Sequence, residues 1–370
     1  MKKKKILFAS TIHRYDDIRI YYKEILSLYK DYDIDLIATG NYKKNVHSYN
    51  ISIELLPIPS NLIKRIYNNF KIFFKALKGR YSGFHFHDPE LILVGCIIKL
   101  FKIKIIYDIH EDNLNVIKIR KWIPFFLKPI ISNIFNLIEK FAVKFFDGII
   151  LAEDSYKNNY IKSKKIVIVR NYVNLLSNPV DIDFNTRNIL YVGSLTIERG
   201  ILDIIKSMNL LQKNNIQTGL FLIGTISKSD EEIILKEINL LPNPNNVKLI
   251  NYCNHNELIK YIKISKVGVS PLRYNENYQN SIPTKILDYM NWGLPYVYSE
   301  LKLSKTIFKN NSGGLGYEIN NINQLYEKLL ILLNDKELCL KLRIQGRKRI
   351  KDFNWNNESK KLGNLYQKIF

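Results

Sequence analysis

The chain has 370 residues, of which 46% are hydrophobic and 24% are charged. Its length exceeds the roughly 250 to 300 residues at which a single hydrophobic core stops growing, so two domains are expected. No segment approaches the roughly 20 consecutive apolar residues of a membrane-spanning helix, which excludes an integral membrane protein of that kind and favours a soluble globular one.

The formal net charge is +22, and it is uneven along the chain. Residues 1–180 hold 30 Lys and Arg against 16 Asp and Glu (+14), and the remainder holds 26 against 18 (+8). Such a field favours an anionic partner, which is a membrane surface, a nucleotide substrate or nucleic acid. No nucleic-acid-binding module is recognisable in the sequence, so we do not expect nucleic acid as the partner.

The cysteines Cys96, Cys253 and Cys339 are far apart and have no paired spacing, which argues against a disulfide framework or a zinc ribbon. This pattern fits a reducing cytoplasm. The basic start, residues 1–5, precedes an apolar run too short for the core of a signal peptide, so we interpret it as the lead-in to a first β-strand.

Short aliphatic runs alternate with longer segments of helical spacing, which is the pattern of parallel βαβ units. The loop-like residues 171–187 interrupt this pattern, and it then restarts. We therefore predict two doubly wound domains, 1–170 and 188–350, joined by a linker, and a helix over 351–370 that packs toward the first domain. A ligand is expected in a cleft between the domains, beyond the carboxyl ends of strands. The predicted strands are 6–10, 34–39, 104–109, 148–152, 166–169, 188–193, 219–224, 247–250, 266–271 and 294–299.

The segment GSLTIERG, residues 193–200, lies between a predicted strand and a predicted helix. Gly193 permits a tight turn, helix-start N–H groups can hold phosphate oxygens, and Arg199 adds a cation with bidentate reach. An ordinary strand-to-helix turn with a surface arginine is the alternative. The combination favours a diphosphate.

The segment IPTKILDYMNWGLP, residues 282–295, begins a helix near Pro283 and places Lys285 and Asp288 on one face. An exposed ion pair on a solvated helix is one interpretation, and it would contribute little. The apolar flanks favour a partly buried cleft instead. An ionised carboxylate there needs donors, and the ribose hydroxyls of a nucleotide supply them.

Polar residues follow other predicted strands, in STIHRYDDIRIYYKE (10–24), FHFHDPE (84–90) and YDIHED (107–112). The histidine spacings match no standard zinc arrangement, so no metal is predicted. His85 and His87 are alternatively hydrogen-bonded strand residues.

The segment 61–80 has six basic residues and no acid, and it forms an amphipathic helix. One interpretation is a core helix with a solvated lysine face, and the other is a helix bound to an anionic membrane leaflet. The apolar segment 121–141 supports the second interpretation. The apolar stripe holds Leu62, Ile66, Phe70, Phe73 and Leu77, and the membrane-facing candidates opposite it are Lys64, Lys71, Lys75 and Lys78.

These motifs together resemble retaining glycosyltransferases of the GT-B fold, of the group 1 or family 4 type. YVGSLTIERG (191–200) looks like VGxLxxxKG, and SIPTKILDYMNWGLPYVYS (281–299) looks like PxKxxEYMxxGxPVV. The N-terminal HRYDDIRIYYKE (13–24), HDPEL (87–91) and YDIHE (107–111) resemble members that build bacterial surface polysaccharides.

The resemblance implies two Rossmann-like domains that face each other across a cleft, with an acceptor in the first and a nucleotide sugar in the second. It makes Asp288 the counterpart of the ribose-binding glutamate and Arg199 that of the phosphate-binding lysine. His110 is implied near the sugar and phosphates. The implied catalytic residues are His110, Arg199 and Lys285, the donor site adds Gly193, Ser194, Pro283, Thr284 and Asp288, and a loop over the diphosphate or acceptor holds His13, Asp17 and Arg19.

The implied reaction transfers a hexosyl or N-acetylhexosaminyl group from a UDP-, GDP- or dTDP-sugar to a glycan or lipid-linked hydroxyl, without a metal or cofactor. The implied location is cytoplasmic, peripheral at the inner face of the plasma membrane. The sequence departs from the family at Ser194, where members often have arginine, and at Asn280, where many have a second glutamate.

Two rival functions are considered. A Rossmann oxidoreductase or nucleotide-sugar epimerase is disfavoured, because no GxGxxG follows the first strand. A catalytically impaired subunit that scaffolds a membrane glycan-assembly complex is favoured by the departures at Asp288 and Ser194.

Overall fold

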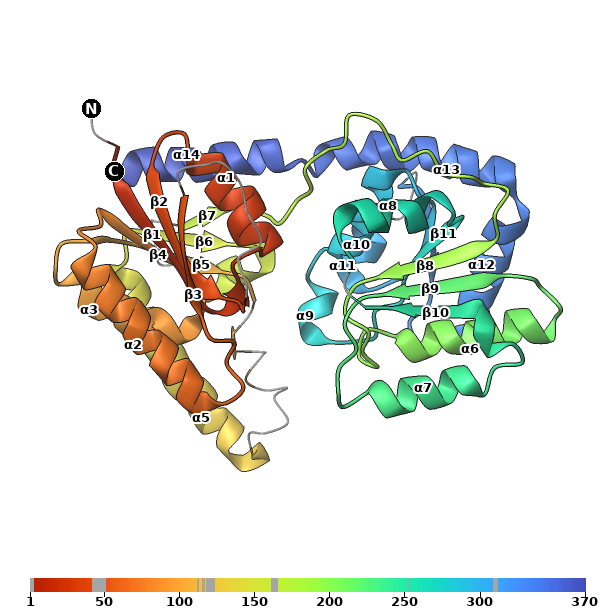
Figure 1. Ribbon diagram of the computed structural model, residues 1–370, viewed down its shortest axis with the longest axis horizontal. Coiled ribbons are helices and arrows are strands. Elements are labelled where there is room, and N and C mark those ends of the chain that lie inside the picture. The colour runs from red at the N-terminus through yellow and green to blue at the C-terminus, as the bar shows by residue number, and fades with distance from the viewer. Residues whose placement is uncertain are drawn as a thin grey trace. The chain divides into compact units, whose positions relative to one another are not determined.

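The computed structural model describes residues 3–41, 51–111, 113–114, 117, 124–160, 166–251, 253–308 and 312–370. The chain forms two compact units, one of Met1–Asn171 with Trp355–Phe370 and one of Tyr172–Asn354. Each unit is a parallel sheet covered by helices (Figure 1). The predicted pair of doubly wound domains is therefore confirmed.

The first unit has a seven-stranded parallel sheet in the order β3-β2-β1-β4-β5-β6-β7. The chain moves outward from β1 in one direction and returns to β4 on its other side. The carboxyl ends of β1 and β4 therefore form a switch point, where doubly wound sheets bind ligands. The strands are β1 (Lys5–Arg14), β2 (Asp33–Thr39), β3 (Ile51–Leu56), β4 (Gly83–Phe86), β5 (Lys104–Ile109), β6 (Gly148–Leu151) and β7 (Ile166–Ile168).

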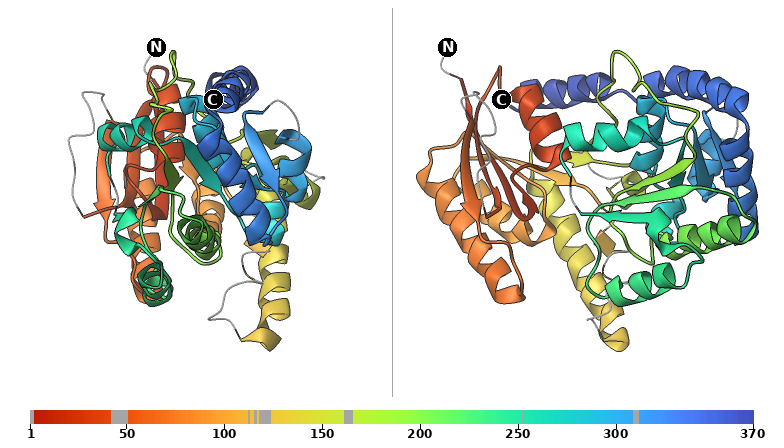
Figure 2. Two further views of the ribbon diagram at one scale, coloured as in Figure 1. Left: turned by 90° about the vertical axis from the view of Figure 1, so that its right-hand side faces the viewer. Right: turned by 45° about the vertical axis from the view of Figure 1, so that its right-hand side comes forward.

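Helices cover both faces of this sheet (Figure 2). Neighbouring strand residues point to opposite faces, so Leu7 belongs to one core cluster and Phe8 to the other. The first cluster packs against α2 (Leu62–Lys78), α3 (Ile92–Lys99) and α5 (Lys128–Phe145); the second packs against η1 (Ile18–Ile25), α1 (Leu26–Leu28) and α14 (Trp355–Ile369). Short helices are η2 (Pro89–Leu91), η3 (Phe125–Leu127) and η4 (Asp154–Tyr160).

The helix α14 belongs to the first unit although it follows the second unit in the chain. The Trp355 indole donates to Ser27 Oγ at 3.0 Å, and the Tyr366 hydroxyl lies 2.6 Å from His85 Nδ1. His85 is thus a buried, hydrogen-bonded strand residue.

The second unit has a six-stranded parallel sheet in the order β10-β9-β8-β11-β12-β13. Its strands are β8 (Asn188–Val192), β9 (Gly219–Ile223), β10 (Val247–Ile250), β11 (Val267–Ser270), β12 (Tyr296–Ser299) and β13 (Gly314–Tyr317). Its helices are α6 (Ile201–Lys213), α7 (Glu231–Asn239), α8 (His255–Lys263), α9 (Glu276–Gln279), α10 (Thr284–Trp292), α11 (Lys302–Phe308), α12 (Ile322–Asn334) and α13 (Lys336–Arg349), with η5 (Pro244–Asn246) and η6 (Ile350–Asp352).

Residues 172–187, which the composition predicts as linker, pack against the second unit. Val180 N donates to Trp292 O at 2.9 Å, and Ile182 and Phe184 join the hydrophobic core. Within the described residues, no helix combines the length and the apolar composition needed to cross a bilayer.

The helix α2 places only part of its predicted apolar stripe against the core. Phe73 packs there, but Leu62 is 68% exposed and Phe70 is 59% exposed, so the expectation of a core helix with the whole stripe inward is wrong. The helix instead buries Asn68, Ile72 and Ala76. Asn68 Nδ2 donates to Thr11 O at 3.3 Å and to Pro57 O at 3.1 Å, and these bonds orient the amide toward the sheet.

Candidate functional site

Gly193 begins the turn between β8 and α6, and its lack of a side chain lets Lys285 approach the backbone. Its φ of 139° lies in the region that favours glycine. A Cβ there would lie 2.5 Å from Lys285 Cε and 2.8 Å from Lys285 Nζ. The absence of a side chain at Gly193 therefore allows Lys285 to cross this turn.

The rest of the turn positions Arg199. Its backbone N–H donates to Thr196 Oγ1 at 3.2 Å, and the Tyr191 hydroxyl donates to Ser194 O at 2.9 Å. Gly200 follows with φ of 80° and packs so closely that a Cβ would lie 1.9 Å from Pro271 O. The turn is thereby held between β8 and the segment after β11.

The helix α10 supplies the second half of this site. Pro283 is the N-cap with extended backbone, and no side chain caps the helix, so its first N–H groups are not satisfied by a capping side chain. Thr284 is exposed and Lys285 is half-buried. The Lys285 ammonium lies 5.1 Å from the centroid of the Tyr191 ring.

Burial and the neighbouring Arg199 charge lower the pKa of Lys285 to about 7, against an opposing effect of Asp288. Two cations therefore share one small site. Such a site favours a ligand with negative charge, because an anion relieves the repulsion between them. Asp288 lies one turn after Lys285, half-buried beside the buried Leu287 and Tyr289.

This pKa predicts a pH dependence of donor binding. Lys285 is an ammonium below about pH 7 and loses its charge above it. The affinity for a nucleotide sugar, whose diphosphate charge is constant in this range, is expected to fall by up to about tenfold per pH unit above pH 7. Calorimetry between pH 6 and 9 measures this effect. The Lys285→Arg variant is the control, because its charge does not titrate; an equal slope in that variant contradicts the assignment.

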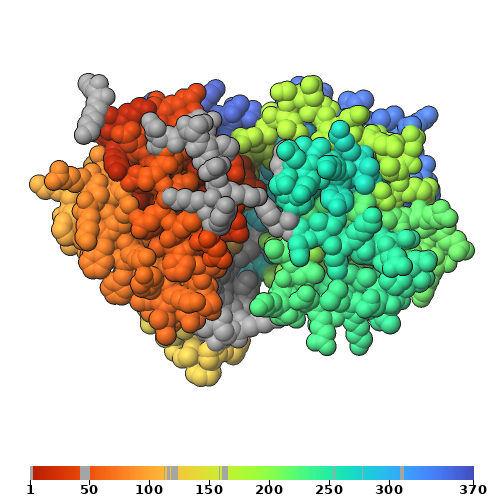
Figure 3. All heavy atoms as spheres, viewed as in Figure 1, coloured from red at the N-terminus to blue at the C-terminus, as the bar shows by residue number. Residues whose placement is uncertain are grey.

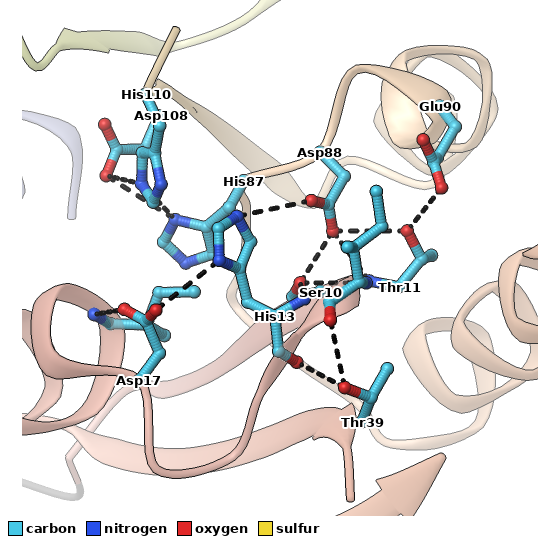
Figure 4. A network of polar contacts seen from close by, with 12 residues as sticks. Ser10, Thr11, His13, Asp17, Thr39, His87, Asp88, Glu90, Asp108 and His110 are labelled. Carbon is cyan, nitrogen blue, oxygen red and sulfur yellow. Dashed lines mark hydrogen bonds and ion pairs between the residues drawn. The ribbon is translucent and has the colours of Figure 1, made fainter. Parts of the chain in front are cut away.

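The first unit holds a second polar cluster at the switch point of its sheet (Figure 4). Asp88, which follows β4, accepts from Ser10 Oγ at 2.7 Å and from Thr11 N at 2.6 Å. Thr11 Oγ1 also donates to Glu90 Oε1 at 2.7 Å. These bonds join the ends of β1 and β4.

His13 lies between two carboxylates at the edge of this cluster. Its Nδ1 is 3.4 Å from Asp17 Oδ2, and its Nε2 is 3.6 Å from Asp88 Oδ1. Burial favours the neutral imidazole, but the bond to Asp17 and the charge of Asp88 raise the pKa of His13 to about 9. Asp17 also caps η1 by accepting from Arg19 N and Ile20 N. His13 is therefore a partly exposed cation near neutral pH, able to bind an anionic or hydroxyl group.

Arg19 lies inside the unit, only 4% exposed. Its Nε and Nη2 donate to Asp108 at 3.1 and 2.9 Å, and its Nε is 3.0 Å from Glu24 Oε1. Despite burial, the Arg19 charge holds the pKa of Asp108 well below its usual range, whereas burial and the Asp108 charge raise the pKa of Glu24. Arg19 thus forms a buried ion pair, which differs from the expected position in a ligand-facing loop.

His110 follows β5 and is oriented by the same carboxylate. Its Nε2 lies 3.0 Å from Asp108 Oδ2 and 3.2 Å from His87 Nδ1. Arg19 Nε also lies 3.2 Å from His110 Nε2. Burial lowers the pKa of His87 to about 4. His110 is partly exposed beside two buried groups, so it is the member of this set that a ligand can reach.

Four buried groups here have the chemistry of metal ligands: Glu24, His85, His87 and Asp108, with ligand atoms within 4.8 Å of one another. The guanidinium of Arg19 already contacts both carboxylates. The guanidinium supplies the positive charge that a metal ion would otherwise supply between these carboxylates. The cluster therefore has a structural role, a buried ion pair, without an ion. The prediction that no metal is required stays a prediction.

The structure brings the expected residues together within each unit. In the second unit, Lys285 lies beside Gly193 and Arg199. The segment with Gly193, Ser194 and Arg199 is thereby next to the segment with Pro283, Thr284 and Asp288. In the first unit, His13, Asp17, Arg19 and His110 share one polar network. Reasoning from the sequence missed Glu24, Asp88, Asp108 and Tyr191 as members of these clusters.

The comparisons with known proteins agree with this architecture. Residues 176–349 match the family model of glycosyl transferases group 1. An uncharacterized glycosyltransferase of Methanocaldococcus jannaschii, MJ1178, is 22% identical over 99% of this chain and 98% of that protein. The residues that match this family model all lie within the second unit.

Solved structures are similar along nearly the whole chain. Sucrose-phosphate synthase from Thermosynechococcus elongatus has a TM-score of 0.76 at 19% identity, with 100% of this chain and 99% of that chain covered. HepE of Anabaena, solved in complex with UDP, has a TM-score of 0.73 at 12% identity, with 99% and 100% covered. These likenesses show the GT-B fold, and with the family match they support glycosyltransferase activity.

Proposed function

We propose that this glycosyltransferase of the GT-B fold transfers a sugar from a nucleotide diphosphate donor to an acceptor hydroxyl with retention at the anomeric carbon. The observation that carries the proposal is the pair of neighbouring cations, Arg199 and Lys285, beside Gly193. A diphosphate fits this site, because its charge relieves the repulsion that lowers the pKa of Lys285. HepE of Anabaena, of similar fold, was solved with UDP.

The chemical step depends on electrostatic stabilisation. The bond between the anomeric carbon and the donor phosphate breaks, a bond to the acceptor oxygen forms, and the departing phosphate takes the acceptor proton. Arg199, Lys285 and the first N–H groups of α10 stabilise the charge that develops on this phosphate. Retention and the contribution of His110 rest on the resemblance of the motifs to retaining enzymes.

The acceptor is assigned to the first unit, with His13 and Asp17 as the residues nearest to it. We propose a hexosyl or N-acetylhexosaminyl transfer to a lipid-linked or polysaccharide acceptor in cell-surface polysaccharide synthesis, at the inner face of the plasma membrane. The resemblance of the N-terminal motifs supports this role.

A donor screen tests the proposal. The purified chain is titrated by calorimetry with UDP-, GDP- and dTDP-sugars, and hydrolysis or transfer is followed in parallel. We expect at least one donor to bind and to be turned over. Binding without turnover with any acceptor favours the alternative, an impaired subunit that scaffolds a glycan-assembly complex, for which Asp288 and Ser194 are the supporting departures. Absence of binding to every donor overturns the proposed function.

Asp288→Ala is expected to weaken donor binding by about 10- to 150-fold, because a hydrogen bond to a charged group contributes about 1.5 to 3 kcal/mol. Calorimetry with the donor found in the screen measures the change. The control is Glu327→Ala, which removes an exposed acid from α12 of the same unit. Asp288→Glu, which restores the residue typical of the family, is expected to keep binding. Unchanged affinity in Asp288→Ala contradicts its assignment to the ribose.

A further inference from the structure

The helix α5 buries polar as well as small apolar residues and exposes large apolar side chains, unlike an ordinary surface helix. Its buried face includes Ser132 and Glu139, and Glu139 accepts from the Tyr107 and Tyr160 hydroxyls at 3.1 and 2.8 Å. Its outer face carries apolar side chains at helical spacing. With the preceding turn, these are Phe126, Ile130, Ile134, Leu137, Phe141 and Phe145, between 49% and 74% exposed.

The helices α2 and α3 continue this pattern. The helix α2 buries the polar Asn68 and exposes Ile63 (76%) and Phe70 (59%). The end of α3 exposes Leu100 (80%) and Phe101 (58%). Soluble monomers rarely expose large contiguous apolar patches, and such patches mark sites of interaction.

These side chains lie on one side of the first unit. The helices α2, α3 and α5 cover the same face of the sheet, and α3 contacts both of the others. Side chains of α2 and α3 (orange) and of α5 (yellow) lie at the surface in Figure 3. Among the described residues of the first unit, all the exposed large apolar side chains except Ile18, Tyr22 and Ile58 lie on these helices or the turns beside them. We call this set the apolar face.

The charges around the apolar face are predominantly basic, although Glu54, Glu90 and Asp147 pair with Lys75, Arg65 and Lys99 there. Glu139 is the single acid on α2, α3 and α5, and it is buried. The remaining charged side chains of the three helices are all basic: Lys64, Arg65, Lys71, Lys75, Lys78, Lys99, Lys128, Lys140 and Lys144. We call these the basic rim.

We propose that the apolar face inserts into the surface of an anionic lipid bilayer while the basic rim contacts the lipid headgroups. A bilayer offers both an apolar layer and a negative headgroup layer, which match the two properties of this surface. A second copy of the chain matches less well. A symmetric dimer would place two predominantly basic sets of side chains against each other, and the acids beside them already pair within the unit.

This inference rests on the proposed function and makes it more specific. The sequence suggested that the lysines of α2 contact the membrane; the structure adds an apolar surface built by three helices. Insertion through this surface attaches the acceptor-binding unit to the bilayer, and the expected acceptor is lipid-linked or grows beside the membrane.

Vesicle flotation of the full chain tests the inference. We expect flotation with phosphatidylglycerol-containing vesicles and little with pure phosphatidylcholine. The apolar-face variant, Phe126→Ser with Leu137→Ser and Phe141→Ser, is expected to lower the partition coefficient by at least about tenfold. The rim variant, Lys64→Gln with Lys71→Gln and Lys78→Gln, is expected to lower it by about 100-fold with anionic vesicles and to reduce its salt dependence.

The control replaces three exposed apolar side chains of the second unit, Ile233→Ser with Leu240→Ser and Ile344→Ser, and it is expected to float like the wild type. Equal losses in control and apolar-face variants overturn the proposal. A dimer in sedimentation that the apolar-face variant abolishes, without vesicle binding by the wild type, also overturns it. Donor binding measured without vesicles distinguishes the proposed function from the membrane inference. If the wild type binds no donor, the proposed function fails, and the membrane inference is judged by flotation.

Discussion

Replacing Arg19 with alanine is expected to lower the free energy of unfolding of the first unit by about 3 to 5 kcal/mol. The guanidinium is nearly fully buried and contacts Asp108 and Glu24, which are both inaccessible to solvent. Removal of this cation leaves two buried acids with no nearby arginine to balance them. The loss therefore reflects the cost of uncompensated buried charge more than the strength of one ion pair.

Amide hydrogen exchange measures this effect for the first unit by itself. Protection is followed in β1 and β5, which carry or adjoin the residues of the cluster, and in β8 and β12 of the second unit as an internal reference. The control is Arg14→Ala, because Arg14 is largely exposed and pairs with Asp16 at the surface; its effect should stay within about 0.5 kcal/mol. A change below about 1 kcal/mol in Arg19→Ala would contradict the structural role.

Replacing Arg199 with alanine is expected to lower kcat by about 100- to 1000-fold, the usual cost of losing one group that stabilises developing negative charge. Arg199 lies close enough to depress the pKa of Lys285, so both cations act on the same anion. Their joint contribution should increase as the phosphate departs. The effect is therefore expected mainly in kcat and less in donor affinity.

Initial rates with the donor identified in the screen test this prediction, with calorimetry to follow affinity. Arg199→Lys restores the residue typical of the family and should recover much of kcat. Lys206→Ala, an exposed cation on α6, controls for the loss of one positive charge in the same region. If Arg199→Ala keeps a third or more of kcat, Arg199 does not stabilise the leaving group.

Most of the fold was predictable from the sequence, because buried parallel strands appear as uninterrupted aliphatic runs. KIIYDI coincides with β5, and the predicted strand 148–152 contains the fully buried β6. The edge strands β3 and β13 and the central strand β4 are absent from the predicted strands. ISIELL in β3 is mostly half-buried, and GLGY in β13 is rich in glycine. Both properties weaken the strand signal in a sequence.

The orientation of α2 could not be predicted from periodicity. An apolar stripe at helical spacing shows that one side of a helix differs from the other, but not which environment the stripe meets. Here Asn68 is buried because two backbone carbonyls lie within reach of its amide. Those carbonyls belong to Thr11 and Pro57, so the decisive contacts are between segments that are not adjacent in the sequence.

The sequence predicts those site residues that lie together in a short motif. Gly193, Arg199 and Lys285 occur in two short segments, and the structure brings them together. Asp108 and Glu24 were missed because their partner is Arg19, and the contacts between them depend on how β5 and η1 meet. Both acids occur in quoted motifs, but only Asp108 lies near a strand end, that of β5, whereas Glu24 lies within η1.

The place of α14 affects how the protein folds during synthesis. The first unit contains β1 to β7, but one of its two hydrophobic faces is completed by Tyr366 and Leu362 of α14. The ribosome makes the whole second unit before this helix emerges, which takes on the order of 10 to 40 seconds at about 5 to 20 residues per second. Until then the nascent first unit exposes an apolar sheet face, and chaperones have a defined surface to bind.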